Sequence, residues 1–403
     1  MNKKLGKEKT LLMWTILLIA MVQMPSLALS PSINQINTQV FPGTKLSTIQ
    51  TVMQLPNLIS PFVTITTAYF IGKGWLSKKG VIITGLFLVA FTGALSLVCH
   101  TQFWHLCLLS CCLGLGLSGY ISTASSLIVD YFTLDERQVI SGYQTSFING
   151  GGILMSLCGG LLATLMWYGG YLMLLLALPV GILALRAIPG GKSEKSGDSG
   201  KEKKKAGIHI HSDVFLYGGF IFVFMLVYNV MGSNLSTHIA GIGNTAAAGY
   251  ATAIQMCGGV ICGLFFGKLS KKFGDYTACF AFIAIFIGMM ILSFFQNSLP
   301  MIFIGVFIAG TAMSMMLPQC MFSVSKVVNE QSSALATSIT SCIAPGLGGF
   351  FSAMVFTNIT EALFGDSTVL RYRFVSFVAL ACAAIIFAIV TARNKKAAVK
   401  AGK

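Results

Sequence analysis

The sequence predicts an all-α membrane protein with twelve transmembrane helices in two pseudo-symmetric six-helix bundles. Hydrophobic residues make up 55% of the 403 residues, and charged residues make up only 10%. A soluble domain carries about 25% charged residues because its surface must be wet. Most of the outer surface of this chain must therefore face lipid.

A short polar stretch divides the chain into two hydrophobic halves. Between Lys192 and Lys205 it holds six Lys and three acids, diluted with Gly and Ser, and it has no apolar face to bury. Such a composition stays a solvated linker. We therefore expect an N-terminal six-helix bundle at 1–188, a cytoplasmic basic linker at 189–212 and a C-terminal six-helix bundle at 213–403.

Each half contains six apolar segments of sufficient length, since a membrane-spanning helix needs about 20 residues. The first half has them at 11–30, 47–72, 80–99, 103–130, 138–163 and 167–188. The second half has them at 213–236, 246–268, 276–295, 299–325, 332–357 and 372–392. The first segment follows a basic N-terminus, and we interpret it as a retained helix rather than a signal peptide.

The basic residues predict the orientation. If the N-terminus is cytoplasmic, 24 of the 27 Lys and Arg lie on that side, and only Lys45, Arg371 and Arg373 lie outside. Cytoplasmic loops of membrane proteins carry such an excess. We expect a multi-pass protein of the cell (plasma) membrane with both termini and the linker in the cytoplasm.

The halves repeat one another. Gly74-Trp-Leu-Ser-Lys-Lys follows the second span, and Gly267-Lys-Leu-Ser-Lys-Lys follows the eighth. In these residues the chain resembles the major facilitator superfamily, whose loop motif is G-x-L-x-D-R-x-G-R/K. The resemblance implies two bundles related by a pseudo-two-fold axis along the membrane normal. Lys78 and Lys271 stand where the family has Asp, and a lysine cannot accept the hydrogen bonds of that Asp.

The fifth span resembles the drug-antiporter branch of this superfamily, which carries G-x8-G-x3-G-P-x2-G-G there. Gly142, Gly151 and Gly159-Gly160 are in register, although Met155-Ser156 replaces the Gly-Pro. Such glycines let two helices approach closely and slide. The alternative interpretation is ordinary small-residue packing. The predicted gating residues are Gly74, Lys78, Lys79, Gly142, Gly151, Gly159, Gly160, Gly267, Lys271, Lys272, Gly274 and Pro345.

The resemblance to this superfamily implies that spans 1, 2, 4, 5, 7, 8, 10 and 11 bound a central cavity. All twelve acids lie at span ends or in loops, and the basic residues behave likewise. A cavity without formal charge suits a neutral or amphipathic substrate. The predicted cavity residues are polar at mid-depth, with one Met as a deformable wall: Gln23, Gln54, Asn57, Tyr120, Gln144, Asn149, Tyr228, Asn229, Gln255, Met315 and Gln319. Hydrogen bonding between helices is the alternative role for each polar one.

Three functions remain open. The first is a secondary active transporter of small organic molecules by alternating access, which exports neutral or amphipathic compounds. The second is an uptake carrier or uniporter for a metabolite such as a weak organic acid. The third is a receptor or scaffold without transport. For a coupling proton, Asp130 is the first candidate and His238 the second, although Asp130 has the alternative of pairing with Arg137.

Other classes are disfavoured by the sequence. Despite the net charge of +15, no basic stripe with interleaved aromatics suggests nucleic acid. No C-x-x-C spacing suggests a metal, and no nucleophile, base and acid constellation suggests an enzyme. We expect no cofactor and no metal, a small-molecule substrate, the lipid bilayer as environment, and a monomer.

The charge asymmetry gives a test of topology. Reporter fusions after Gly197 and after Lys403 should both report a cytoplasmic location, because the basic residues stay on that side of the membrane. An external signal from either fusion would contradict the twelve-span arrangement.

Overall fold

The computed structural model describes residues 3–132, 134–189, 212–325 and 339–401. Among these residues every regular element is a helix and none is a strand, which confirms the all-α class. Ten segments of the described chain are long and apolar enough to cross a membrane. One of them, Thr245–Phe294, contains two helices, and the helix Leu55–Gly72 is not among the ten. The chain is a multi-pass membrane protein, and the count of twelve spans stays a prediction.

Contacts group the chain into two compact units, which are described separately below. The first unit comprises Met1–Pro42 and Val52–His209, and the second comprises Gly43–Thr51 and Ile210–Lys403. The short segment 43–51, which includes the first residues of the predicted second span (47–72), is therefore counted with the second unit. Residues 190–211, which make up nearly all of the predicted linker, lie outside the described residues. The predicted domain boundaries stay a prediction.

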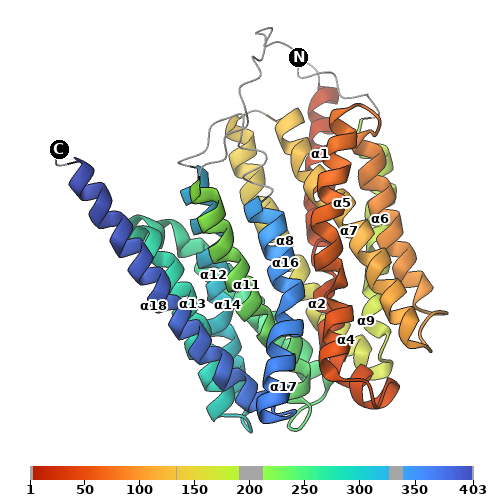
Figure 1. The fold of residues 1–403 in the computed structure, drawn as a ribbon. Helices are drawn as coiled ribbons and strands as arrows, with labels where there is room; N and C mark the ends of the chain where they lie inside the picture. Colours follow the sequence, from red (N-terminus) through yellow and green to blue (C-terminus); the bar gives the residue numbers. More distant parts are fainter. Residues whose placement is uncertain (1–2, 133, 190–211, 326–338, 402–403) are drawn as a thin grey trace. The chain divides into compact units, whose positions relative to one another are not determined.

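The first unit is built from helices with several interruptions (Figure 1). Its elements are α1 (Lys3–Met21), α2 (Ser26–Leu29), η1 (Ser30–Ser32), α3 (Ile33–Gln35), η2 (Ile36–Val40), α5 (Leu55–Gly72), α6 (Lys78–Leu95), α7 (Phe103–Tyr131), α8 (Leu134–Leu165), α9 (Gly169–Leu172), η3 (Met173–Leu176) and α10 (Ala177–Ala187). Helix α4 (Leu46–Met53) precedes α5, and its residues up to Thr51 belong to the second unit.

The second unit has a continuous apolar core. Its elements are α11 (Ser212–Ile239), α12 (Thr245–Phe273), η4 (Gly274–Tyr276), α13 (Thr277–Phe294), α14 (Leu299–Ser325), η5 (Ile339–Ile343), α16 (Ala344–Ser352), η6 (Ala353–Thr357), α17 (Asn358–Phe364) and α18 (Thr368–Ala401). Helix α13 packs against α14 and α18, and α14 packs against α12 (Figure 1). Phe224 of α11 meets Phe282 of α13 edge to face, and both rings are fully buried.

The first predicted span is broken rather than continuous. Helix α1 ends at Met21 and α2 begins at Ser26, so Pro25 immediately precedes the second piece. Proline has no N–H and clashes with the preceding turn, which explains why the helix stops there. The buried hydroxyl of Tyr120 in α7 donates to the Val22 carbonyl at 2.5 Å. This bond satisfies a carbonyl at the break.

The glycines of the fifth span pack against this broken helix. A Cβ on Gly151 would lie 1.9 Å from the Met21 carbonyl oxygen, and a Cβ on Gly159 would lie 2.5 Å from the Ala28 backbone. In the second unit, a Cβ on Gly348 of α16 would lie 2.5 Å from the Phe222 carbonyl of α11. These close approaches join helices of the same unit. A sliding contact between the two bundles stays a prediction.

A pair of glycine variants tests this packing. A Cβ on Gly150, in the same helix as Gly159, would have no atom within 4 Å. We expect Gly159→Leu to lower the midpoint of thermal unfolding in detergent by a few degrees, because overpacking costs about 1–3 kcal/mol. Gly150→Leu should unfold within about 2 °C of the parent, as surface substitutions do. Equal midpoints for both variants would show that α8 moves to accommodate the larger side chain at position 159 without loss of stability.

Candidate functional site

Three predicted cavity residues lie at helix breaks of the first unit. Gln54 separates α4 from α5, and its side-chain oxygen accepts a hydrogen bond from Asn57 Nδ2 at 2.5 Å. Gln23 lies in the break between α1 and α2, and its buried Nε2 has no hydrogen-bond partner. A buried amide donor without a partner costs free energy that a bound molecule recovers. Gln23 therefore has unused capacity to bind, as do Gln35 and Asn37 of the same unit, each with a buried side-chain oxygen that has no hydrogen-bond partner.

Other predicted cavity residues of the first unit bond to neighbouring helices. Tyr120 bonds to Val22, as described above. Gln144 of α8 is buried and donates from Nε2 to Ser125 Oγ of α7 at 3.0 Å. Asn149 is half-buried in α8. For Tyr120 and Gln144 the structure shows the alternative role, hydrogen bonding between helices.

In the second unit the predicted polar residues form a pair between α11 and α12. Gln255 Nε2 donates to the Tyr228 hydroxyl at 2.9 Å, and the Tyr228 ring stacks on Phe224 with 5.4 Å between ring centroids. Asn229 is half-buried and donates to the Met225 carbonyl of its own helix. Met315 belongs to the apolar core, with 7% of its surface exposed. This pair is uncharged and offers both a donor and an acceptor.

Gln319 lies in a different network, centred on Asp275. The Asp275 carboxylate accepts from the Tyr217 hydroxyl at 2.8 Å, from Ser323 Oγ at 2.6 Å and from Gln319 Nε2 at 3.0 Å. Ser270 donates in turn to the Gln319 side-chain oxygen at 2.7 Å. The network joins α11, α12, η4 and α14. No motif in the sequence marks Asp275 as its centre.

Comparison with known proteins assigns the family. The sequence model described as Major Facilitator Superfamily matches residues 10–353. The chain belongs to this superfamily. A sequence comparison with curated proteins gives no match.

Solved transporter structures share the fold of this superfamily member. The crystal structure of the nucleoside transporter NupG has a TM-score of 0.76 at 13% identity, covering 97% of this chain and 99% of that chain. The peptide-family (POT) transporter PepTSo has a TM-score of 0.76 at 9% identity, covering 96% and 98%. An inward-facing bacterial homologue of the human lysosomal transporter Spinster has a TM-score of 0.70 at 16% identity, covering 97% and 96%. The drug-antiporter branch is not established by these likenesses.

The two copies of the superfamily loop motif fold differently. In the first copy, Gly74 has φ +75° in the turn between α5 and α6, a conformation that suits glycine. In the second copy, α12 continues through the exposed Gly267 and stops at Gly274, which has φ +53°. The repeat in sequence is thus not a repeat in local structure. Of the other predicted gating residues, Gly142 and Gly160 lie in α8, and Pro345 lies in the first turn of α16.

The lysines of the motif have identifiable surroundings. Lys78 Nζ lies 2.6 Å from Asp130 Oδ2 at the end of α7, and both side chains are partly exposed. The coupling candidate Asp130 is therefore paired with a motif lysine. Lys79 is half-buried, whereas Lys271 and Lys272 are exposed. The first motif copy thus carries a Lys–Asp pair in which the lysine occupies the position of the family's Asp.

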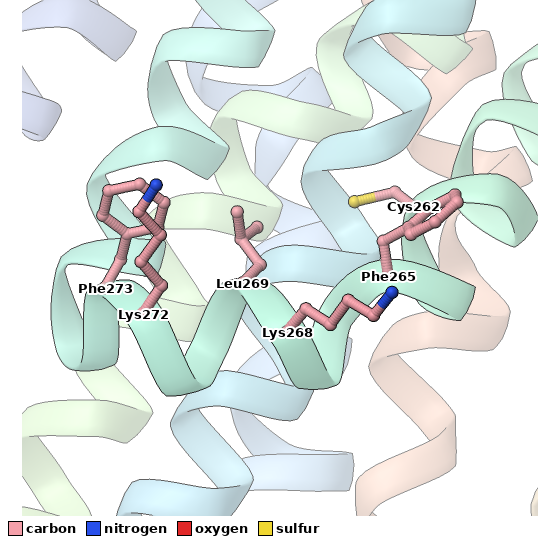
Figure 2. A pocket seen from close by; sticks show the side chains of 6 residues that line it. All are labelled: Cys262, Phe265, Lys268, Leu269, Lys272 and Phe273. Atoms are coloured by element: carbon pink, nitrogen blue, oxygen red, sulfur yellow. The ribbon is translucent and has the colours of Figure 1, made fainter.

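A shallow groove of about 440 Å³ runs along α12 beside the second motif copy. Figure 2 shows the six side chains that line it, all from that helix, with Lys272 beside Phe273. The Lys272 ammonium lies 5.3 Å from the centre of the Phe273 ring. The groove is lined by Cys262, Phe265, Lys268, Leu269, Lys272 and Phe273. It therefore combines apolar surface with the ammonium groups of its two lysines.

One basic residue at a span end is fully buried. Helix α18 begins at Thr368, four residues before the predicted span, and Arg371 within it is fully buried. Its Nη1 donates to Asn234 Oδ1, and its Nη2 lies 3.7 Å from Glu361 Oε1. His238, the second coupling candidate, lies four residues after Asn234 and is buried, with Nδ1 3.1 Å from Thr368 Oγ1. The sequence did not predict the burial of Arg371, because a basic residue at the edge of a hydrophobic segment is usually exposed to water.

The Asp275 network gives a stability test. Asp275→Asn keeps the shape but replaces one acceptor oxygen by an amide donor, so at least one of the three donors loses its partner. We expect the thermal midpoint in detergent to fall by a few degrees, since such a loss costs about 1–3 kcal/mol. Asp366→Asn, at an exposed position of the same unit, is the control and should melt like the parent. An unchanged midpoint for Asp275→Asn would show that water replaces the lost bond.

Proposed function

We propose that this superfamily member is a secondary active transporter that moves small organic molecules by alternating access of its two units. We also propose that it lies in the cell membrane with both termini in the cytoplasm, as the basic residues indicate. The observation that carries the proposal is the transporter fold over nearly the whole chain, together with uncharged polar side chains in each unit.

The polar side chains support a neutral or amphipathic substrate. Gln23 and the Gln54–Asn57 pair in the first unit offer amides, and the Gln255–Tyr228 pair offers an amide and a hydroxyl. None of these groups carries a formal charge, so none favours an ion over a neutral molecule by Coulomb attraction. The buried Arg371 does not change this, because its charge is balanced by Glu361 at 3.7 Å.

The direction of transport has two candidates. Export is favoured by the glycine spacing of α8, which resembles that of drug antiporters. Uptake or uniport is favoured because no acid is among the mid-depth residues predicted to line the cavity, whereas a proton antiporter usually needs a titratable group there. It is also consistent with the nucleoside and peptide transporters that share the fold. We place export first and keep uptake of a metabolite, such as a weak organic acid, as the alternative.

A proton is the proposed coupling ion, and Asp130 is the proposed carrier. The Lys78 ammonium beside it would be left without its partner when Asp130 is protonated. That change would alter the contact between α6 and α7. His238 is the second candidate, because its imidazole is buried in the second unit.

Transport assays decide between these proposals. Purified protein in liposomes should be tested in both directions against nucleosides, dipeptides, weak organic acids and amphipathic cations, with and without a pH gradient. We expect accumulation of a neutral or amphipathic compound, driven by the gradient in the export direction. Asp130→Asn should still exchange that compound at equilibrium but should not concentrate it. Equal accumulation by Asp130→Asn would make Asp130 structural, and movement without response to the gradient would indicate a uniporter.

A variant of the polar pair tests the binding site. Gln255→Leu removes the amide that contacts Tyr228, and we expect the KM for the transported compound to rise about five- to tenfold, as loss of one hydrogen bond predicts. Asn358→Leu, at an exposed amide of the same unit, is the control and should leave KM unchanged. An unaltered KM for Gln255→Leu would place the substrate elsewhere.

A further inference from the structure

The groove on α12 has an apolar part and a charged part, which follow one another along the helix (Figure 2). Cys262 and Phe265 line the apolar part. Lys268 follows Phe265 by about one turn and Lys272 by about two turns, so their ammonium groups lie at the other end of the groove. Phe265 is 58% exposed, although it is a large apolar side chain. The groove therefore offers an uncovered apolar wall that leads to two positive charges.

The length of α12 explains why lysines follow apolar side chains on it. Its 29 residues rise by about 43 Å, whereas the hydrocarbon core of a bilayer is about 30 Å thick. When the apolar residues 256–266 lie in hydrocarbon, the turn that ends at Phe273 extends to the lipid headgroups. Lys268 reaches the same level by extension of its side chain, as lysines near helix ends do. Lipid phosphates lie at that level, so both lysines of the groove are within reach of them.

The two ammonium groups of the groove have no carboxylate within ion-pair distance among the described residues. The acid that follows in sequence, Asp275, already accepts hydrogen bonds from three neutral donors. In the first motif copy, by contrast, Lys78 lies 2.6 Å from Asp130. The second copy thus carries positive charge that the described protein does not neutralise, and an anion from outside can do so.

The end of a helix favours lysine even without a ligand, because its free carbonyl groups carry partial negative charge. That effect falls off within the last turn, which holds Lys271 and Lys272. Lys268 lies one turn earlier, on the same face as Lys272, so the helix end does not account for it. Two like charges four residues apart on a helix repel one another. An anion bound between them removes this repulsion.

From these observations we propose that the groove binds an acidic phospholipid, with the phosphate between Lys268 and Lys272 and an acyl chain along Phe265 and Cys262. Charge complementarity selects the headgroup, because the lysines repel the cationic group of a zwitterionic lipid. The exposed apolar wall selects a lipid over a free phosphate, which would leave Phe265 in contact with water. The predicted orientation puts this lipid in the cytoplasmic leaflet, where acidic lipids attract basic segments. The binding itself does not depend on the proposed transport.

Lipid binding to the purified full chain tests the proposal without a transport substrate. Native mass spectrometry in detergent gives the dissociation constant of the first bound molecule of phosphatidylglycerol and of phosphatidylcholine with the same acyl chains. Each ammonium near an acidic headgroup strengthens binding about fivefold, so phosphatidylglycerol should bind at least about tenfold more tightly than phosphatidylcholine. Equal dissociation constants for the two lipids would overturn the proposal.

Charge variants locate the binding. Lys268→Gln/Lys272→Gln should abolish the preference for phosphatidylglycerol, because both ammonium groups of the groove are removed. The matched control is Lys45→Gln/Lys395→Gln, which removes the same charge outside the groove and should keep the preference. All four lysines are exposed, so neither variant alters the core. A preference that survives in the groove variant, or that falls equally in both variants, would overturn the proposal.

Thiol protection tests the apolar part of the groove. A chain that keeps only Cys262 is compared with one that keeps only Cys382 of α18, outside the groove, and both thiols are partly buried. Phosphatidylglycerol should slow the reaction of Cys262 with a small maleimide severalfold and leave that of Cys382 unchanged. Glycerol 3-phosphate, which has no acyl chain, should slow neither reaction. Equal protection of Cys262 by glycerol 3-phosphate would show an anion site without a lipid, and no protection by phosphatidylglycerol would place the lipid elsewhere. Either result would overturn the proposal.

Discussion

Hydrocarbon offers no partner to a backbone carbonyl or N–H, and this constraint governs the structure. It requires helices, whose backbone groups bond within the segment. It also means that each interruption of a helix must be completed by side chains. The break before Pro25 is completed in part by the Tyr120 hydroxyl, which donates to the Val22 carbonyl. The Tyr120 side chain on α7 thereby compensates for the helix break at Pro25 in the first span. The side-chain Nε2 of Gln23, in the same break, has no hydrogen-bond partner.

Close helix packing follows from the same environment. Lipid chains are as apolar as leucine, so the hydrophobic effect does not press one membrane helix against another, and small residues that permit backbone contact take its place. Gly151 and Gly159 admit the backbone of the first span, Gly348 admits α11, and Gly310 admits the Gln255 carbonyl. The last contact matters for the candidate site, because it fixes α12 against α14 at the residue whose side chain bonds to Tyr228.

The sequence predicted the helical class, the family and most segment positions, because composition and hydrophobic length record the lipid environment directly. It also identified Gln255 and Tyr228, which the structure joins. The sequence could not predict hydrogen-bond partners, because it shows which residues of a span are polar but not which of them face each other. The structure adds the partners of two other predicted cavity residues: Tyr120 donates to a carbonyl, and Gln319 donates to Asp275. Arg371 was placed in a loop for the same reason, because the sequence does not show that it packs against Thr360 and Glu361 of α17 and against the distant Asn234.

The charged and uncharged polar groups of this chain therefore occupy different places. The carboxylates with several partners, Asp275 and Glu361, lie near helix ends, where three donors or an arginine hold them. The pairs at mid-helix, such as Gln255 with Tyr228, are neutral and make few bonds. A neutral pair exchanges one hydrogen-bond partner for another at little cost, whereas a buried ion pair resists separation. Neutral pairs therefore suit a site that must bind and release a substrate in each cycle. Charged groups with several partners suit the fixed ends of the helices around that site.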